Sequence, residues 1–470
     1  MVRFDPTVLS RWSLGEWTQT PCNEISGFSI DSRKLNSGDL FIALRAERDG
    51  HEFLNQAASA GAVGGLVEYP IEGESLPQLV VDDSLVAFQT IAKSHRNEYQ
   101  GTVVGVTGSC GKTSTKEILN LLLPQSLCTE GNLNNYLGVP LTLCRLSSEI
   151  HKFAVVEAGI NQPDEMSLLA DMIRPDVTLF TSINHSHLQG LGNVETVARE
   201  KAKLWLDSEQ CNLAIFPDSV LEHQAFSDAI AKRQHYIAIS PEKAGAEPSD
   251  QLVLYCLSTE TNERGYSQSL TIKRCGCPPL VVDIPEVSDG IISNMVLAAI
   301  TAWKLGVSDQ EISERLPQYR PSGLRGTRLV GRGCSYVVDC YNANPASMID
   351  SVSFFCSQFK NLPKLLVLGG MNELGDSSEL LHQKTGEMIF LGPNDRAVLI
   401  GKDASHMASG MIQNGAQDEN ITLVPETESA RSLIQNFKGA VLLKGSRSYR
   451  LEKLVPSGAV EEGEQMKLAC

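Results

Sequence analysis

The segment "VVGVTGSCGKTSTKEIL", from Val103 to Leu119, decides how the rest of the chain is interpreted. Its β-branched residues predict a short buried strand, its two glycines permit a tight turn, and the "TSTKEIL" that follows begins a helical pattern. The backbone N–H groups of such a turn and the N-terminus of the helix both favour an anion. A strand, a Gly-x-x-Gly-Lys-Thr turn and a helix in this order predict a loop that holds nucleotide phosphates.

Within this loop, Lys112 has the length to reach terminal phosphate oxygens, and the Thr113 hydroxyl can ligate Mg²⁺. The longer eight-residue form of the motif needs glycine at position 106, where this chain has Val106, so the match is to a shorter form. A plain strand–turn–helix with a surface lysine is the alternative, but it does not account for paired glycines followed by Lys-Thr. We therefore expect the phosphates to contact Gly108, Ser109, Cys110, Gly111, Lys112, Thr113 and Ser114.

The composition excludes several classes of protein. The net charge of −16 over 470 residues, without a local basic stripe, argues against a nucleic-acid partner. No apolar run reaches the ~18 residues of a membrane span, and the N-terminus lacks the apolar run of a signal peptide. The twelve cysteines show no zinc-like spacing. We expect a reduced, cytoplasmic chain.

The order of strand-like and helical segments predicts three domains, covering residues 1–100, 101–315 and 316–470. A polar stretch, "HRNEYQ", ends the first range, and "RLPQYRPSGLRGTRL" opens the third. In the second and third ranges, strand-like runs alternate with stretches long enough for crossover helices, which predicts an α/β fold with parallel sheets covered on both faces. Two strand-like runs within residues 240–285 look antiparallel and are expected to extend the edge of the central sheet.

Candidate metal ligands follow two of the predicted strands. Glu157 ends the apolar run "FAVVE", and His185 and His187 follow "VTLFTSI". Ligand sites in open parallel sheets lie at these carboxyl ends of the strands. A carboxylate that caps the following segment is the alternative for Glu157. Two histidines in one polar loop favour a metal or phosphate role, but the sequence does not decide which of them has it.

Together these residues resemble the Mur ligase family, the ATP-dependent ligases that build the peptide stem of peptidoglycan. The resemblance covers nearly the whole chain. It rests on "TGSCGKTSTKE", "EGNLNNYLGVPLTL", "VVEAGIN", "SHLQGLGNVETVAREKAKLW", "DCYNANPASM", "LGGMNELGDSS" and "LLKGSRS". It implies a three-domain α/β architecture with a central ATP-binding P-loop domain. An N-terminal domain that binds the UDP substrate precedes it, and a smaller Rossmann-like domain that closes on ATP and binds the dipeptide follows.

The resemblance also implies roles for individual residues. Lys112, Glu157, His187 and Lys201 are expected to be catalytic, with Lys201 carbamylated. Thr113, Glu157, His187 and Lys201 are expected to hold magnesium, with two ions in the site. Asn294, Arg325 and Asp339 are expected to join the phosphate loop in binding ATP, and Arg325 is favoured over Arg328 as the hinge arginine. The residues expected to bind the UDP substrate are Ser29, Asp31, Ser32, Arg33, Asn134 and Asn135, beside a matching element at Asp49, Gly50 and His51. Those expected on the dipeptide side of the cleft are Asn342, Asn344, Lys444, Ser446 and Arg447.

The segments "NLNNYLGVPLTL" and "YNANPASM" are similar to the branch of the family that adds a dipeptide. The implied reaction joins D-Ala-D-Ala to the C-terminal carboxylate of UDP-MurNAc-tripeptide through an acyl phosphate, in the cytoplasm and as a monomer. One alternative is a sibling ligase that adds a single amino acid, or the related folate polyglutamylation enzyme. Another is a nucleotide-binding regulatory module.

Three features depart from the family pattern or stay open. Gly290 and Ile291 stand where a His-Asn pair is usual near the adenine, which leaves Asn294. Ala202 and Lys203 replace the usual Gly-Glu after Lys201, and Lys203 is expected to put a second cation beside the carbamate. His382 is expected at the surface rather than in the cleft.

Overall fold

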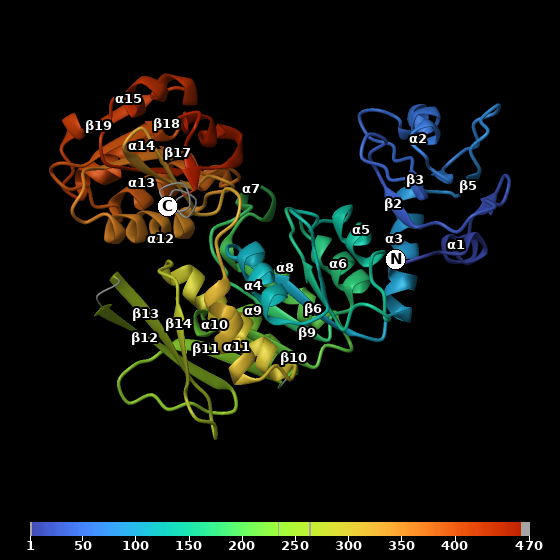
Figure 1. The fold of residues 1–470 in the computed structure, drawn as a ribbon, viewed down its shortest axis with the longest axis horizontal. Coiled ribbons are helices and arrows are strands. Elements are labelled where there is room, and N and C mark those ends of the chain that lie inside the picture. Colours follow the sequence, from blue (N-terminus) through green and yellow to red (C-terminus); the bar gives the residue numbers. More distant parts are fainter. Residues whose placement is uncertain (1, 234, 263–264, 462–470) are drawn as a thin grey trace, which may run out of the picture.

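The computed structural model describes residues 2–233, 235–262 and 265–461. Within these residues, strands form three separate sheets, one in each of the ranges 1–100, 101–315 and 316–470. Figure 1 shows the third sheet at the upper left, the first sheet at the upper right and the central sheet below them. The described α/β layers agree with the predicted fold class. The domain boundaries themselves stay a prediction.

The first sheet is small and has the strand order β1-β5-β4-β3-β2. Its strands β2 to β5 are parallel, and the short β1 pairs antiparallel with β5. The helix α3 (Ser84–Glu98) packs on α1 on one side and on helices α5 and α6 of the central region on the other, so it joins the two regions. The remaining elements are α1 (Pro6–Ser13), β1 (Glu16–Trp17), β2 (Gly27–Ser29), β3 (Asp39–Ile42), α2 (Leu54–Ser59), β4 (Gly64–Val67) and β5 (Gln78–Val80).

The central sheet positions the phosphate loop. Its order is β14-β13-β12-β11-β10-β9-β6-β8-β7, so β6 (Thr102–Thr107) lies between β8 (Phe153–Glu157) and β9 (Val177–Phe180). Strands β6 to β12 are parallel. The pairs β12–β13 and β13–β14 are antiparallel, which confirms the predicted extension of the sheet edge. The remaining strands are β7 (Ser126–Cys128), β10 (Leu213–Pro217), β11 (Tyr236–Pro241), β12 (Leu252–Asn262), β13 (Gly265–Lys273) and β14 (Leu280–Ile284).

Helices cover both faces of this sheet, as expected for strands that are apolar on both sides. Val104 and Val106 of β6 belong to the core beneath α4 and α10, whereas Val103 belongs to the core on the opposite face. The helices are α4 (Lys112–Leu122), α5 (Gly138–Leu143), α6 (Glu165–Ile173), α7 (Leu188–Leu191), α8 (Val194–Leu206), α9 (Gln224–Lys232), α10 (Asp289–Lys304) and α11 (Asp309–Arg315).

The third sheet has the order β19-β18-β17-β20-β16-β15-β21. The five strands from β19 to β16 are parallel, and β15 and β21 add an antiparallel edge. The strands are β15 (Thr327–Gly331), β16 (Cys334–Asp339), β17 (Lys364–Gly369), β18 (Arg396–Ile400), β19 (Ile421–Val424), β20 (Ala440–Lys444) and β21 (Val460–Glu461).

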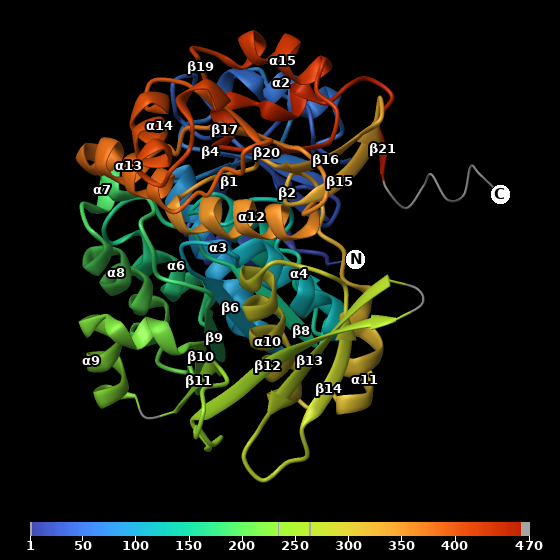
Figure 2. The same ribbon diagram turned by 90° about the vertical axis from the view of Figure 1, so that its left-hand side faces the viewer.

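The helices of the third region are α12 (Pro345–Gln358), α13 (Ser378–Glu387), α14 (Ala404–Gln413) and α15 (Arg431–Gln435). Figure 2 shows α12 lying between the third sheet and the top of α10, where it contacts α10. No helix in the described part of the chain combines the length and apolar character needed to cross a bilayer.

Candidate active site

The phosphate loop connects β6 to α4 and needs both of its glycines. Gly108 has φ +150° and Gly111 has φ +80°, a region that L-residues with a Cβ rarely adopt. A Cβ at position 108 would lie 2.0 Å from Oγ1 of Thr181, and one at position 111 would lie 2.6 Å from Oδ1 of Asn294. The loop is therefore packed closely against the end of β9 and against α10, and Asn294 lies beside it.

The lysine of the loop is folded back on the loop itself. Its Nζ donates to the carbonyl of Gly108 at 2.8 Å, and burial lowers the pKa of Lys112. Ser109 ties the loop to the segment after β9, because its Oγ donates to the carbonyl of Asn184 at 3.0 Å and accepts from Oγ of Ser186 at 2.9 Å. These bonds fix the loop before any phosphate binds.

Glu157, at the end of β8, is 1% exposed and faces the loop. Its carboxylate accepts from Oγ1 of Thr113 at 3.1 Å and from Nδ2 of Asn134 at 2.7 Å, and Nζ of Lys116 lies 3.2 Å from it. Burial would raise the pKa of Glu157, but the charges of Lys116 and Lys112 outweigh this effect and lower it. The side chain therefore belongs to the phosphate-loop network.

Lys116 is a buried partner that the sequence analysis missed. It is 2% exposed, and its Nζ donates to the carbonyls of Thr129 at 2.8 Å and Gly131 at 2.7 Å. Its position in the sequence could have indicated this role. Lys116 lies one helical turn after Lys112 and Thr113, so it shares their face of α4.

Lys201, on α8, is fully buried and lacks a hydrogen-bond partner for its Nζ among the described residues. Burial, assisted by the charge of Lys112, lowers its pKa well below the ordinary value. Lys203 does not add a cation there, contrary to expectation. Its Nζ lies 2.7 Å from Asp164 and 2.8 Å from Glu200, because two residues along a helix turn a side chain by roughly 200°.

Of the two histidines after β9, His187 is the one drawn into the site, whereas His185 is exposed. Nδ1 of His187 lies 2.6 Å from Oε2 of Glu373, a close contact between the imidazole and the carboxylate. Burial lowers the pKa of His187, although Glu373 opposes this shift. Glu373 belongs to the segment after β17, and the sequence analysis did not single it out because the contact spans two domains.

Two further residue pairs join the phosphate loop to the third region, Cys110 with Asn344 and Thr113 with Arg325. Sγ of Cys110 lies 3.1 Å from Oδ1 and 2.7 Å from Nδ2 of Asn344, and burial raises the pKa of that thiol. Nη2 of Arg325 donates to Oγ1 of Thr113 at 3.0 Å, while its guanidinium stacks 4.0 Å from the ring of Tyr341. Arg328 instead donates to Gln358 at 3.0 Å. Of the two arginines, Arg325 is the one on the loop.

Comparisons with known proteins agree with this geometry. The family model described as the Mur ligase middle domain matches residues 106–302, and the model described as "Mur ligase, glutamate ligase domain" matches residues 325–447. The UDP-N-acetylmuramoyl-tripeptide–D-alanyl-D-alanine ligase of Bacillus subtilis is 30% identical over 92% of both chains. The enzyme of that name from Escherichia coli is 31% identical over 92% of this chain and 93% of its own.

This chain belongs to the Mur ligase family. A crystal structure of MurF from Acinetobacter baumannii superposes with a TM-score of 0.84 and 28% identity, over 97% of this chain and 98% of that one. The three-domain Mur ligase architecture expected from the motifs is thereby confirmed.

In this Mur ligase, the pair Gly290-Ile291 has a structural consequence. Asp350 of α12 reaches the N-terminus of α10, where it accepts from Oγ of Ser288 at 2.7 Å and from the N–H of Gly290 at 3.1 Å. A Cβ at position 290 would lie 2.8 Å from the carboxylate of Asp350. Glycine at position 290 therefore leaves room for this contact between domains.

Among the predicted residues of the third domain, Lys444 contacts Asp339 and Asn342. Nζ of Lys444 lies 2.9 Å from the carboxylate of Asp339, at the ends of β20 and β16, and donates to the carbonyl of Asn342 at 3.0 Å. Ser446 and Arg447 follow β20 on the same side. Oγ of Ser446 accepts from the N–H of Asn372 at 2.9 Å, and Arg447 pairs with Glu452 at 2.7 Å.

Four of the predicted UDP-binding residues, Ser29, Asp31, Ser32 and Arg33, lie in β2 and the segment after it, at the far end of the molecule from the third sheet (Figure 1). Asn134 and Asn135 lie in the central domain, between β7 and α5. Asp31 pairs with Arg33 at 2.9 Å, and the hydrogen bond from Arg33 lowers the pKa of Asp31 to about 2. Ser29 bonds to the carbonyl of Asp31, and Ser32 to Gln56. Of the neighbouring pair, Asn134 is bound to Glu157, whereas Oδ1 of Asn135 accepts from the N–H groups of Leu137 and Gly138, where α5 begins.

The element at Asp49–His51 forms a compact cluster with Glu68 and Tyr69. Nδ1 of His51 lies 2.6 Å from Asp49, and its Nε2 accepts from the N–H of Glu68 at 2.9 Å. The ring of His51 stacks on that of Tyr69 with the centroids 4.1 Å apart. His51 is thus built into the core of the first domain.

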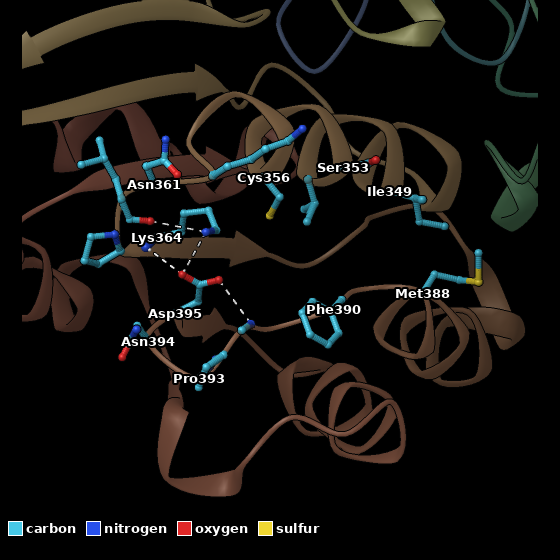
Figure 3. Close-up of a pocket in the computed structure, with 15 residues that line it drawn as sticks. Ile349, Ser353, Cys356, Asn361, Lys364, Met388, Phe390, Pro393, Asn394 and Asp395 are labelled. Carbon is cyan, nitrogen blue, oxygen red and sulfur yellow. Dashed lines mark hydrogen bonds and ion pairs between the residues drawn. The ribbon is translucent and has the colours of Figure 1, made fainter.

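A cavity of about 580 Å³ lies elsewhere in the third domain, between α12 and the segment around Pro393 (Figure 3). It contains none of the predicted site residues. Lys364 and Asp395 in its wall pair with each other at 3.2 Å. We assign the candidate active site to the phosphate loop and its neighbours, because the charged and strained groups are gathered there.

His382 was expected at the surface and is instead fully buried. Its Nε2 accepts from the N–H of Met371 at 2.9 Å, and its Nδ1 lies 2.7 Å from the carbonyl of Ser378. One ring nitrogen thus binds the N–H of Met371 in the loop before α13, and the other binds the carbonyl of Ser378, where α13 begins.

Proposed function

We propose that this Mur ligase joins D-Ala-D-Ala to the C-terminal carboxylate of UDP-MurNAc-tripeptide, with ATP converted to ADP and phosphate. The observation that carries the proposal is the 30% and 31% identity, over 92% of this chain, to relatives named for this reaction. It is supported by a phosphate loop whose lysine, threonine and glycines lie in the order that the chemistry requires.

Formation of an amide from a free carboxylate needs a leaving group, which ATP provides by making an acyl phosphate. The transferred phosphoryl group carries spread negative charge, so cations and fixed N–H groups must surround it. Lys112, the backbone of residues 108–114 and the N-terminus of α4 supply them in this chain. Arg325, Asn294 and Asp339 are proposed to hold the rest of the nucleotide.

The residues present fit a magnesium site that includes a modified lysine. Among the described residues, no three His, Cys, Asp or Glu side chains gather closely enough to hold a metal unaided. The buried Lys201, with its unpaired Nζ and lowered pKa, is a poor place for an ammonium ion and a suitable place for a neutral amine that captures CO₂. We propose that Thr113, Glu157, His187 and carbamylated Lys201 hold two Mg²⁺ ions. When bound, these ions would neutralise phosphate charge and orient the carboxylate.

The amine of the dipeptide then attacks the acyl phosphate, and phosphate leaves. Water must be excluded at this stage, because an acyl phosphate hydrolyses. We propose that the third domain closes the site, with Asn342, Asn344, Lys444, Ser446 and Arg447 on the dipeptide side. Ser29, Asp31, Ser32, Arg33, Asn134 and Asn135 are proposed to bind the UDP substrate. The domain boundaries at residues 100 and 315, the monomeric state and the cytoplasmic location are proposed with the same reaction.

Phosphate release by the purified chain tests the proposal. With ATP and Mg²⁺, we expect release only when UDP-MurNAc-tripeptide and D-Ala-D-Ala are both present, with the pentapeptide product identified by mass. Release with a single amino acid in place of the dipeptide would favour a sibling ligase. Binding of ATP without any release would favour a regulatory module.

The matched variants are Lys112→Ala and Lys243→Ala, which removes an exposed lysine of the central domain. Loss of the loop lysine should reduce the rate by about 10²–10³-fold, as for other groups that stabilise developing charge, while UDP-substrate binding persists. An unchanged rate of phosphate release in Lys112→Ala would show that the phosphate loop does not take part in the reaction.

A further inference from the structure

Glu373 reaches from the third domain to a histidine of the central domain. It lies in the segment between β17 and α13, and its Oε2 is 2.6 Å from Nδ1 of His187 in the segment between β9 and α7. His187 is mostly buried, with 17% of its side chain exposed, whereas half of the Glu373 side chain is exposed. The contact therefore joins two domains at the margin of the phosphate site.

Both residues have a backbone conformation that is unfavourable for a side chain with a Cβ. His187 has φ +54° and Glu373 has φ +64°. Non-glycine residues in this region are destabilising and persist only where the surroundings hold them. Two such residues facing each other across a domain boundary indicate that the pair is maintained for its geometry.

The backbone around Glu373 is anchored to the same helix that His187 begins. The N–H of Gln189 donates to the carbonyl of Glu373 at 3.0 Å. A Cβ at Gly375 would lie 3.3 Å from Cα of Gln189, so the two segments are in close contact. Movement of the third domain would separate the carboxylate from the imidazole.

We propose that Glu373 is a positioning residue, which fixes the ring of His187 for its ligand only while the third domain is docked. Metal-binding histidines commonly place their other ring nitrogen against a carboxylate, which sets the orientation of the ring. Glu373 occupies Nδ1 and leaves Nε2 for the ligand. The inference rests on the proposed function, since that function gives His187 its metal.

Binding of Mn²⁺ in the presence of ADP, measured by EPR without the UDP substrate, tests the role directly. We expect Glu373→Ala to weaken Mn²⁺ binding by about 10–100-fold, the usual effect of losing such a partner. Glu373→Gln keeps an oxygen near Nδ1 and should therefore weaken Mn²⁺ binding less than Glu373→Ala does. The control is Glu379→Ala, which removes an exposed carboxylate of α13 and should leave binding unchanged.

Kinetics separate positioning from a general structural effect. In Glu373→Ala, kcat should fall while KM for the UDP substrate stays within about threefold, because none of the residues proposed to bind that substrate contacts Glu373 in the structure. The double variant with His187→Ala should be no worse than His187→Ala alone, since both changes remove one interaction.

Several results would overturn the proposal. One is a Glu373→Ala protein that binds Mn²⁺ as tightly as the wild type. Another is a wild type that binds Mn²⁺ no better than His187→Ala. If the alanine variant does not fold, the isosteric Glu373→Gln carries the same comparison. A wild type that releases no phosphate with both substrates would instead refute the proposed function, while the Mn²⁺ comparison still decides the role of Glu373.

Discussion

At the scale of single residues, the pair Lys116–Glu157 is the most consequential contact of the candidate site. Both side chains are about 2% exposed, and each would be a costly unpaired charge without the other. Lys116 also satisfies two backbone carbonyls of the segment after β7, so it holds that segment against α4. The lysine thus allows a carboxylate to stay charged in the core of the central domain.

We predict that Lys116→Met lowers the free energy of unfolding of the central domain by about 3–5 kcal/mol, because it leaves the carboxylate of Glu157 buried and unpaired. Urea unfolding followed by fluorescence measures the change. The double variant Lys116→Met/Glu157→Gln, which removes the charge as well, should recover part of the loss. A double variant less stable than Lys116→Met would contradict this account.

At the scale of elements, the loop between β17 and α13 depends on a neutral histidine. Burial lowers the pKa of His382 below its ordinary value of 6.5, and its Nε2 accepts from a backbone N–H. Protonation of the imidazole would place an N–H at Nε2 directly opposite the N–H of Met371, and the hydrogen bond would be lost. Because the unfolded chain binds the proton more readily, the stabilisation from neutral His382 is fully present above pH 6.5 and is lost as the pH falls below it.

We therefore predict that the melting temperature of the wild type declines more steeply between about pH 7 and pH 5 than that of His382→Gln, which cannot take up a proton. Scanning calorimetry across this range measures the two slopes. His235→Gln, which changes an exposed histidine, should keep the wild-type slope. Equal slopes in wild type and His382→Gln would show that this histidine does not control the loop.

Local signals explain which elements could be predicted. The strand, turn and helix around Gly108 and Gly111 are decided by neighbours in sequence, and they are found as expected. The antiparallel strands β12 and β13 were likewise recognisable from their composition. The surface position predicted for His382 is wrong. The residue lies on α13, and this helix is covered by α14, which follows β18 and is not a neighbour in the sequence.

At the scale of the whole molecule, the third domain is held on the central domain by contacts that no local pattern predicts. Asn344, Glu373 and Asp350 meet Cys110, His187 and the start of α10, respectively. Each pair joins residues far apart in the sequence. The motifs could nominate Asn344, but the partners of Glu373 and Asp350 become visible only once the domains are docked.

We predict that Asp350→Ala loosens this docking. Its carboxylate accepts two bonds from the N-terminus of α10, and hydrogen bonds to a charged group contribute about 1.5–3 kcal/mol each. Small-angle X-ray scattering should show a larger radius of gyration for this variant than for the wild type. Asp418→Ala, which removes an exposed carboxylate of the third domain, is the control. An unchanged scattering curve would assign the docking to the other contacts.

The folded-back Lys112 has a consequence for how a nucleotide enters. The ammonium group already donates to the carbonyl of Gly108 and the residue is partly buried, so part of the dehydration of this cation takes place during folding rather than during the encounter with ATP. An incoming triphosphate then replaces the neutral carbonyl oxygen of Gly108 as the acceptor of the Lys112 ammonium group. The loop therefore holds its lysine in place with its own carbonyl and gives up this hydrogen bond when a phosphate oxygen, a stronger acceptor, binds the ammonium group.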